Sequence, residues 1–161
     1  MTGALWDEVG DLWHADVLGT LPDVRIDDVS LDEWQELLDL FAERRWRREY
    51  RESGRLLPSP SAAWALAGPE GVEAPELRVW PADDVLVVVR FRREDRIDLD
   101  VDLRELRDRR RFSTLCGFIR DVGRLLDRPV SLYPEGANGE PVIGYTPEAD
   151  DVIRLTPPSG E

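Results

Sequence analysis

The sequence contains no lysine, one cysteine and one histidine, and each of these scarcities excludes a kind of chemistry. All 21 basic residues are arginine, which excludes a Schiff-base lysine, a P-loop lysine and a Ser-Lys pair. Cys116 alone cannot form an internal disulfide, and Cys116 with His14 cannot form a zinc site of the usual His/Cys type. Carboxylates are the only catalytic or metal-binding side chains present in number, and we predict no bound cofactor.

The sequence also lacks long apolar runs. No run approaches the ~20 residues that a membrane-spanning helix needs, and the first eight residues lack the positive flank of a signal peptide. We therefore expect a cytoplasmic protein with no membrane partner.

Length and composition predict one domain. The chain has 161 residues, of which 42% are hydrophobic, and a chain of this size buries roughly 68–70% of its unfolded surface. We expect a single α+β domain over residues 1–161. Within it we expect an acidic helical part (1–43), a sheet with a core helix (44–155) and a flexible tail (156–161).

The clearest strand pattern lies between Val85 and Leu103. A continuous apolar run (85–89) precedes a charged turn (93–96), after which apolar and acidic residues alternate up to Leu103. β-Branched residues, period-two alternation and a polar connector of this length predict a hairpin with one buried face. The first strand is apolar enough to lie centrally in a sheet.

Two helices are indicated as clearly. Ser30 and Glu33 form a capping box at the start of a helix whose apolar stripe runs to Phe41. Apolar residues at helical spacing from Phe112 to Leu126 predict the main core helix.

The remaining segments predict short elements. A short amphipathic helix is expected over 5–17, a connector or a short extended piece over 23–29, and a charged, helical stretch over 104–111. Strands are expected at about 45–51, 55–57, 77–80, 130–133, 142–145 and 152–155, with a helical turn after Ser61 and a turn at Asn138-Gly139. For 45–51 a continuation of the preceding helix is the alternative. The order helix, helix, strands, helix, strands predicts an antiparallel β-sheet with helices packed on one face.

The net charge of −13 is distributed unevenly along the chain. Residues 1–43 carry twelve acids and only Arg25, a net charge of −11. Residues 44–132 have a net charge of +3, and residues 133–161 one of −5. Because phosphates are bound by positive surface, we expect no nucleic-acid partner. The acidic N-terminal third favours a basic protein partner, whose encounter its field would accelerate.

We predict that this partner contacts the acidic N-terminal third. Trp6 and Trp13 could be partly exposed anchors of the interface, although a place in the core is the default for both. The predicted contact residues are Trp6, Trp13, Asp7, Glu8, Asp11, Asp27, Asp28, Asp32, Glu36 and Asp39.

The acidic row of the hairpin offers a different chemistry. Asp98, Asp100 and Asp102 alternate along one strand, and their spacing could hold a divalent cation. The calcium-loop pattern fails, because Leu103 stands where a glycine is needed and Arg109 where the terminal glutamate is needed. A solvated sheet face is the simpler interpretation, so we predict no metal site. As part of an open sheet face, the same row could also be a contact surface.

Other chemistry-bearing residues have simpler explanations. Cys116 lies on the apolar stripe of the core helix and is expected to be buried, and His14 is expected to be an ordinary surface histidine. The arginines of residues 44–55 are interleaved with aromatic residues, as in nucleic-acid stripes, but we expect them to pair with nearby acids. Three further tryptophans fit core positions: Trp34, Trp64 and Trp80.

The chain resembles the small acidic bacterial immunity proteins of polymorphic-toxin systems. The likeness is carried by the hairpin of 85–103, by the segment 118–145 and by the helix start Ser30-Leu31-Asp32-Glu33-Trp34. The segment 118–145 includes Leu125-Leu126-Asp127-Arg128-Pro129-Val130 and Tyr133-Pro134-Glu135-Gly136. The resemblance is one of architecture and transfers no functional residue.

This resemblance implies a cytoplasmic protein that neutralises a partner by binding its active or substrate site. Such proteins are often acidic because many of the toxins they bind are basic nucleases. We therefore predict a non-enzymatic inhibitor that binds a basic partner such as a toxin domain. The alternatives are a metal-dependent enzyme that uses the Asp98/Asp100/Asp102 row and a structural or assembly subunit.

Overall fold

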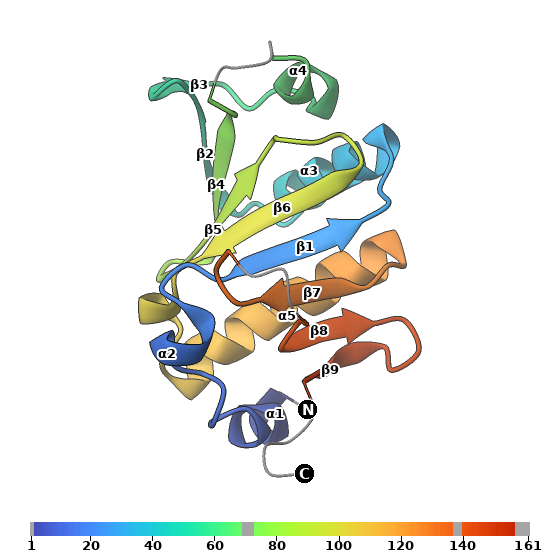
Figure 1. Cartoon of the computed structure of the whole chain (residues 1–161). Coiled ribbons are helices and arrows are strands. Elements are labelled where there is room, and N and C mark those ends of the chain that lie inside the picture. The colour runs from blue at the N-terminus through green and yellow to red at the C-terminus, as the bar shows by residue number, and fades with distance from the viewer. Residues whose placement is uncertain (1, 69–72, 137–139, 157–161) are drawn as a thin grey trace.

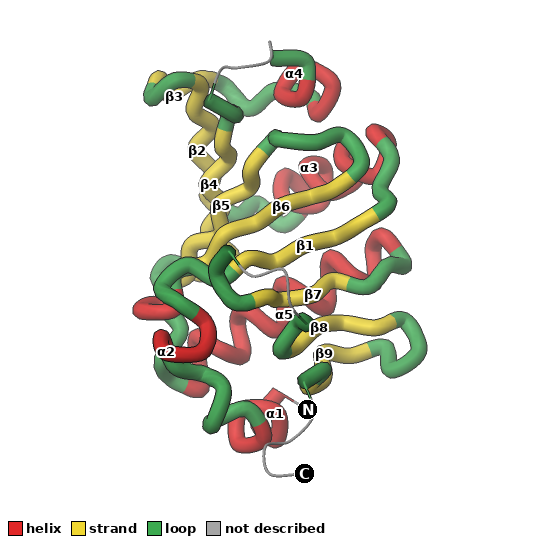
Figure 2. The backbone as a smooth tube through the Cα atoms, in the orientation of Figure 1, coloured by secondary structure: helices red, strands yellow, loops and turns green. Residues whose placement is uncertain are grey.

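A nine-stranded antiparallel sheet organises the fold (Figure 1). The computed structural model describes residues 2–68, 73–136 and 140–156, and in these the strand order is β3-β2-β4-β5-β6-β1-β7-β8-β9. The strands are β1 (Asp23–Asp27), β2 (Arg47–Glu52), β3 (Arg55–Leu57), β4 (Glu76–Ala82), β5 (Val85–Arg90), β6 (Arg96–Val101), β7 (Val130–Tyr133), β8 (Ile143–Thr146) and β9 (Asp151–Arg154). The sheet is strongly twisted. Figure 2 shows that β2 and β4, near one edge, run across the direction of β1 and β7.

Helices cover one face of the sheet, which confirms the predicted α+β class. The helices of the described part are α1 (Thr2–Glu8), α2 (Ala15–Leu18), α3 (Leu31–Glu43), α4 (Ala62–Leu66) and α5 (Arg109–Leu126), with a 3₁₀ turn η1 (Leu103–Glu105). The longest helix, α5, runs behind the sheet in Figure 1 and contacts β4, β5, β7, β8 and β9. It also contacts α1 and α3.

The sheet face toward α5 is apolar because each strand places alternate residues on it. One cross-strand row on this face joins Tyr50, Leu77, Val89, Leu99 and Val24. Each of these side chains is at most 2% exposed. Full burial of such a side chain stabilises the fold by about 1.5–3 kcal/mol, so this row forms much of the core.

The backbone of α5 comes close to the sheet at Gly123. A Cβ at this position would lie 2.2 Å from the ring of Tyr145 on β8. Only glycine therefore permits this contact, although its conformational freedom costs about 1 kcal/mol in a helix.

The position of β1 differs most from the sequence-based expectation. Residues 23–29 are expected to form a connector or a short extended piece, and Asp23–Asp27 forms a strand that pairs with both β6 and β7. Only Val24 and Ile26 on this strand are buried apolar residues. Two apolar residues are too few to show a strand period in the sequence. The segment forms a strand because it pairs with β6 on one side and β7 on the other.

The N-terminal helix expected over 5–17 is interrupted. Between α1 and α2 the chain turns at Gly10, and His14 has an extended backbone. The charged stretch after β6 differs too, because α5 begins at Arg109, after the N-cap Asp108. In the first case the turn at Gly10 interrupts the expected helix, and in the second the N-cap Asp108 sets where the helix begins.

The tryptophans expected in the core have different environments. Trp34 is fully buried, but Trp64 is 67% exposed, so that prediction is wrong. The indole Nε1 of Trp64 donates to Glu52 at 3.1 Å. Trp80 is half-buried on the sheet face away from α5. Cys116 is buried, as predicted, and burial raises the pKa of its thiol to about 12.

Two expectations cannot be compared with the structure. The turn at Asn138-Gly139 and, apart from Thr156, the tail 156–161 lie outside the described residues. Within the described ranges, no helix combines the length and apolarity that crossing a bilayer requires.

Candidate functional site

The ten predicted contact residues fall into two separate groups, one on α1 beside the edge strand β9 and one on α3 and β1 at the middle of the sheet (Figure 1). The first group lies on α1 and the turn after it, against α5 and β9: Trp6, Asp7, Glu8, Asp11 and Trp13. The second lies at the end of β1 and on α3, which packs against α4 and α5: Asp27, Asp28, Asp32, Glu36 and Asp39. The acidic N-terminal third therefore does not form one continuous surface.

Two carboxylates of the first group are met by arginines from distant parts of the chain. Asp7 Oδ1 lies 3.0 Å from Arg109 Nη2, at the start of α5. Asp11 Oδ1 lies 3.0 Å from Arg154 Nη1 on β9, and the same nitrogen donates to the carbonyl of Glu8. This group joins α1 to the rest of the fold.

The two tryptophans of the first group pack inward. Trp13 is 6% exposed, and its Nε1 donates to the carbonyl of Leu106 at 2.8 Å. Trp6 is half-buried, with its ring centroid 5.1 Å from that of Phe112. The core interpretation is confirmed for Trp13, and the alternative of a partly exposed anchor is wrong for it. Trp6 likewise contacts the core.

The carboxylates of the second group on α3 face solvent. Asp32, Glu36 and Asp39 follow at spacings of four and three residues, which places them on one side of the helix. Glu43 continues this spacing and was missed as a contact residue, although the same period indicates it. All four are exposed, and within the described residues none lies in an ion pair with an arginine. We call these four residues the α3 carboxylate row.

Glu33 shows that position on α3 decides the role of an acid. Ser30 Oγ accepts a hydrogen bond from the Glu33 amide at 3.1 Å, and Glu33 Oε1 accepts one from the Ser30 amide at 3.0 Å. The predicted capping box is thus confirmed. Arg128 Nε lies 2.7 Å from Glu33 Oε2, and its hydrogen bond holds the pKa of Glu33 below the usual range. Glu33 therefore stabilises the fold and does not belong to the row.

Two further exposed carboxylates adjoin the amino end of α3. Asp27 ends β1, and Asp28 follows it in the left-handed backbone region with a φ of 59°. Aspartate tolerates this region better than most residues. The turn carries the chain from the sheet to the N-cap Ser30, so Asp27 and Asp28 extend the exposed negative charge beyond the helix.

A different set of acids lies on the sheet face that α5 does not cover. One cross-strand row there reads Arg51, Glu76, Arg90, Asp98 and Arg25, on five neighbouring strands. Charge alternates along this row, and each opposite pair directly across strands contributes about 0.2–1 kcal/mol. We call these five residues the open-face row.

The acids of the Asp98/Asp100/Asp102 row, considered above as an alternative metal site, each meet an arginine. Asp98 is 5% exposed, so a solvated face is wrong for this residue, and its Oδ1 lies 3.0 Å from Arg96 Nε. Asp100 is paired with Arg90 at 2.9 Å. Asp102 caps η1 and is paired with its neighbour Arg104 at 2.8 Å. Across the residues that the structure describes, no three potential ligands gather around a common point.

Two carboxyls of like charge oppose each other on the open face. Asp23 on β1 lies directly across from Asp100 on β6. Burial, followed by the proximity of Asp100, raises the pKa of Asp23. Arg25, 3.7 Å from Asp23, opposes this shift only weakly. At this pair, two like charges face each other across neighbouring strands.

Arginines of the open face are also held by aromatic rings and acids. The Arg47 guanidinium lies 4.1 Å from the Trp80 ring centroid, and that of Arg25 lies 4.5 Å from the Tyr133 centroid. Arg47 is in addition 3.0 Å from Glu49, so the expected pairing with a nearby acid is confirmed for it. The expectation is wrong for Arg48, which has no ion pair among the described residues. Much of the charge on this face is therefore neutralised internally.

Comparison of the chain with protein-family models, with curated proteins and with solved structures found no match. The chain's own residues thus carry the functional argument.

Proposed function

We propose that this chain is a non-enzymatic protein that binds and neutralises a basic protein partner, as the immunity proteins that it resembles do. The partner docks on the α3 carboxylate row, beside Asp27 and Asp28. One observation carries this proposal. The four acids of the row are exposed and lie in no ion pair with an arginine within the described residues, whereas Asp7, Asp11 and Asp98 each contact one.

The concentration of negative charge on one side of α3 favours a basic partner. Like charges four residues apart on a helix repel each other by about 0.2–0.5 kcal/mol, and a positive surface would remove this repulsion. The field of the row also accelerates the encounter with a basic protein. Exposed charges are screened beyond ~8 Å at physiological ionic strength, so the association rate should fall as salt is added.

A matched pair of triple variants tests the proposal. Each variant removes three charges, either from α3 (D32N, E36Q, D39N) or from α1 and the turn after it (D7N, E8Q, D11N, the α1 variant). Both variants and the wild-type chain serve as baits for proteins of the native cell, and the association rate of each captured partner is then measured at several salt concentrations. The α1 variant controls for a general loss of negative charge.

We expect the wild-type chain and the α1 variant to retain a basic protein that the α3 variant loses. Its association with the wild-type chain should slow as salt rises, and the α3 variant should associate slowly even at low salt. Equal capture by all three baits would contradict the proposal. So would an association rate that is independent of salt.

The two edges of the sheet favour one alternative, a structural or assembly subunit. The edge strands β3 and β9 each carry an exposed apolar side chain, Leu56 at 62% and Ile153 at 37% exposure. An open edge can pair with the edge of another chain. Mass measurement in solution separates the two functions. A concentration-dependent oligomer that Leu56→Lys dissociates would favour assembly, and a monomer favours the binding protein.

A further inference from the structure

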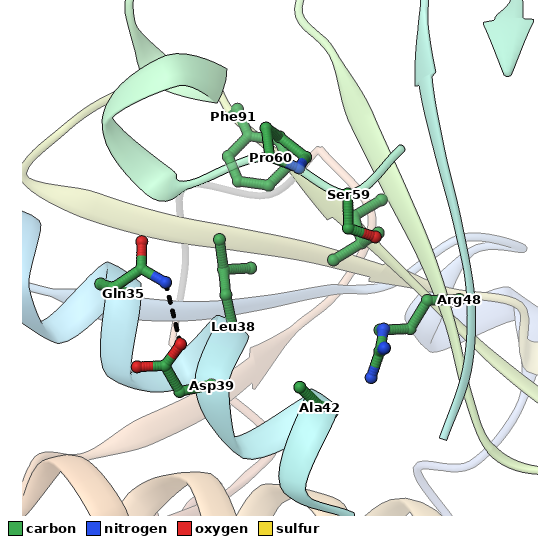
Figure 3. Close-up of a pocket in the computed structure, with 9 residues that line it drawn as sticks. Gln35, Leu38, Asp39, Ala42, Arg48, Ser59, Pro60 and Phe91 are labelled. Carbon is green, nitrogen blue, oxygen red and sulfur yellow. Dashed lines mark hydrogen bonds between the residues drawn. The ribbon is translucent and has the colours of Figure 1, made fainter. Parts of the chain in front are cut away.

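A small cavity lies between α3 and the sheet, and Asp39 of the α3 carboxylate row is one of the residues that line it (Figure 3). Its volume is about 170 Å³. Leu38, Leu77, Pro60 and Phe91 supply apolar walls, from α3, β4 and two loops. An apolar cavity of about 150 Å³ can hold a benzene ring, so a space of this volume has room for a ligand of that size.

Arg48 on β2 supplies a positive charge to this apolar space. Figure 3 shows its guanidinium pointing into the cavity, below Ser59 and toward Ala42 of α3. Its Nη1 is sealed from solvent, and among the described residues it has no hydrogen-bond partner. A buried N–H without an acceptor costs free energy that a bound acceptor would recover.

Asp39 also lines this cavity, but it does not accept a hydrogen bond from Arg48 Nη1. Asp39 Oδ1 accepts a hydrogen bond from Gln35 Nε2 at 2.9 Å, and no ion pair links Asp39 to Arg48 among the described residues. Gln35 is fixed at its other end, because its Oε1 accepts from the Ala62 amide at 2.8 Å. Asp39 is therefore held on the α3 wall, across from Arg48.

We infer that this cavity binds a small monocarboxylate with an apolar body. The carboxylate accepts hydrogen bonds from Arg48, whose planar guanidinium matches its geometry, and the body lies against Leu38, Leu77 and Phe91. Asp39 on the opposite wall repels a second negative charge, which selects one carboxylate over two. This inference does not depend on the proposed docking of a basic partner, because Arg48 carries it.

Benzoate is the first probe, and benzamide is its neutral match in shape. Binding to the full chain is followed by calorimetry and by NMR shifts of the β2 and α3 amides. We expect benzoate to bind about tenfold or more tightly than benzamide. Arg48→Gln should abolish this difference, and Arg48→Lys should restore part of it. Arg55→Gln, an exposed guanidinium outside the cavity, should change nothing.

A second probe distinguishes the source of the carboxylate. N-acetyl-glycyl-phenylalanine is compared with the same peptide amidated at its C terminus. Tighter binding than benzoate, lost on amidation, assigns the site to the C terminus of a protein or peptide. Weaker binding than benzoate assigns it to a free small molecule. Either result supports a monocarboxylate site.

Three results overturn the inference. They are equal affinity for benzoate and benzamide, benzoate binding that Arg48→Gln leaves unchanged, and no binding of any probe at about 10 mM. If circular dichroism shows that Arg48→Gln does not fold, Ala42→Phe replaces it. Ala42 is exposed on α3 and lines the cavity, so a phenyl ring there fills the space and must abolish benzoate binding. Unchanged binding then overturns the inference.

Discussion

The acids of the open sheet face and those of α3 are the same residue types in opposite environments. In the open-face row, Asp98 lies between Arg90 and Arg25 on neighbouring strands and is almost fully buried. Glu36 on α3 is exposed and, within the described residues, has no ion-pair partner. The first acid therefore serves the fold, and the second remains available to a partner.

This difference teaches that net charge alone does not locate a docking surface. A carboxylate within a ladder of arginines contributes little to the field outside the molecule, because the neighbouring positive charges cancel it. Removing its partner is costly, because a buried charge is then left uncompensated. An exposed acid has the opposite properties, since it contributes to the field and its removal hardly changes stability.

The largest expected effect is that of Asp98→Ala. Removal of this nearly buried carboxylate leaves the half-buried Arg96 without its partner, and we expect a loss of about 3 kcal/mol in the free energy of unfolding. Glu36→Ala is the matched control, with a change within about 0.5 kcal/mol. Urea unfolding at neutral pH measures both. Similar losses in the two variants would remove the distinction between the two sets of acids.

A smaller effect is expected for Glu33→Gln, which tests the one α3 acid that behaves like those of the open face. Loss of its charged hydrogen bond with Arg128 should cost about 1 kcal/mol at neutral pH. Because the pKa of Glu33 is lowered in the fold, this stabilisation exists at neutral pH and is lost as pH falls. The two unfolding free energies should therefore converge below about pH 4. A difference that persists in acid would show that packing causes it.

The smallest effect, of opposite sign, is expected for Asp23→Asn. The raised pKa of Asp23 means that the folded state favours its protonated form, so stability falls as pH rises through that pKa. Asparagine removes this loss and the repulsion by Asp100, and it should stabilise the chain by about 0.5 kcal/mol at neutral pH. The gain should vanish near pH 3, where the carboxyl is protonated in both states. Destabilisation at neutral pH would mean that the ion pair with Arg25 dominates.

Much of the fold could be predicted from local patterns. The capping box at Ser30, the core helix ending at Leu126 and the hairpin 85–103 correspond to α3, α5 and β5–β6. In each, several residues repeat with a clear period or satisfy identifiable backbone groups. β1 has only two buried apolar residues, so its pattern is too short to separate a strand from a connector.

The candidate site could be predicted only in part. Asp32, Glu36 and Asp39 are visible as the polar side of an amphipathic helix, and Glu43 follows from the same spacing. Nothing local shows that Asp7 meets Arg109, since these residues are about a hundred positions apart and come together only when α1 packs on α5. The cavity at Arg48 is equally non-local, because α3, β2, β4 and two loops build its walls.

The amino-acid sequence by itself determined the class of the fold, the main helices, the central hairpin and the shortage of lysine, cysteine and histidine that restricts the chemistry. Hydrophobic period and capping are local properties, and they are already present in a short stretch of chain. The tertiary structure alone decided which acids are neutralised and which remain exposed. A carboxylate's role depends on the charges that the fold brings within a few ångströms of it, and strand order and helix packing set those distances.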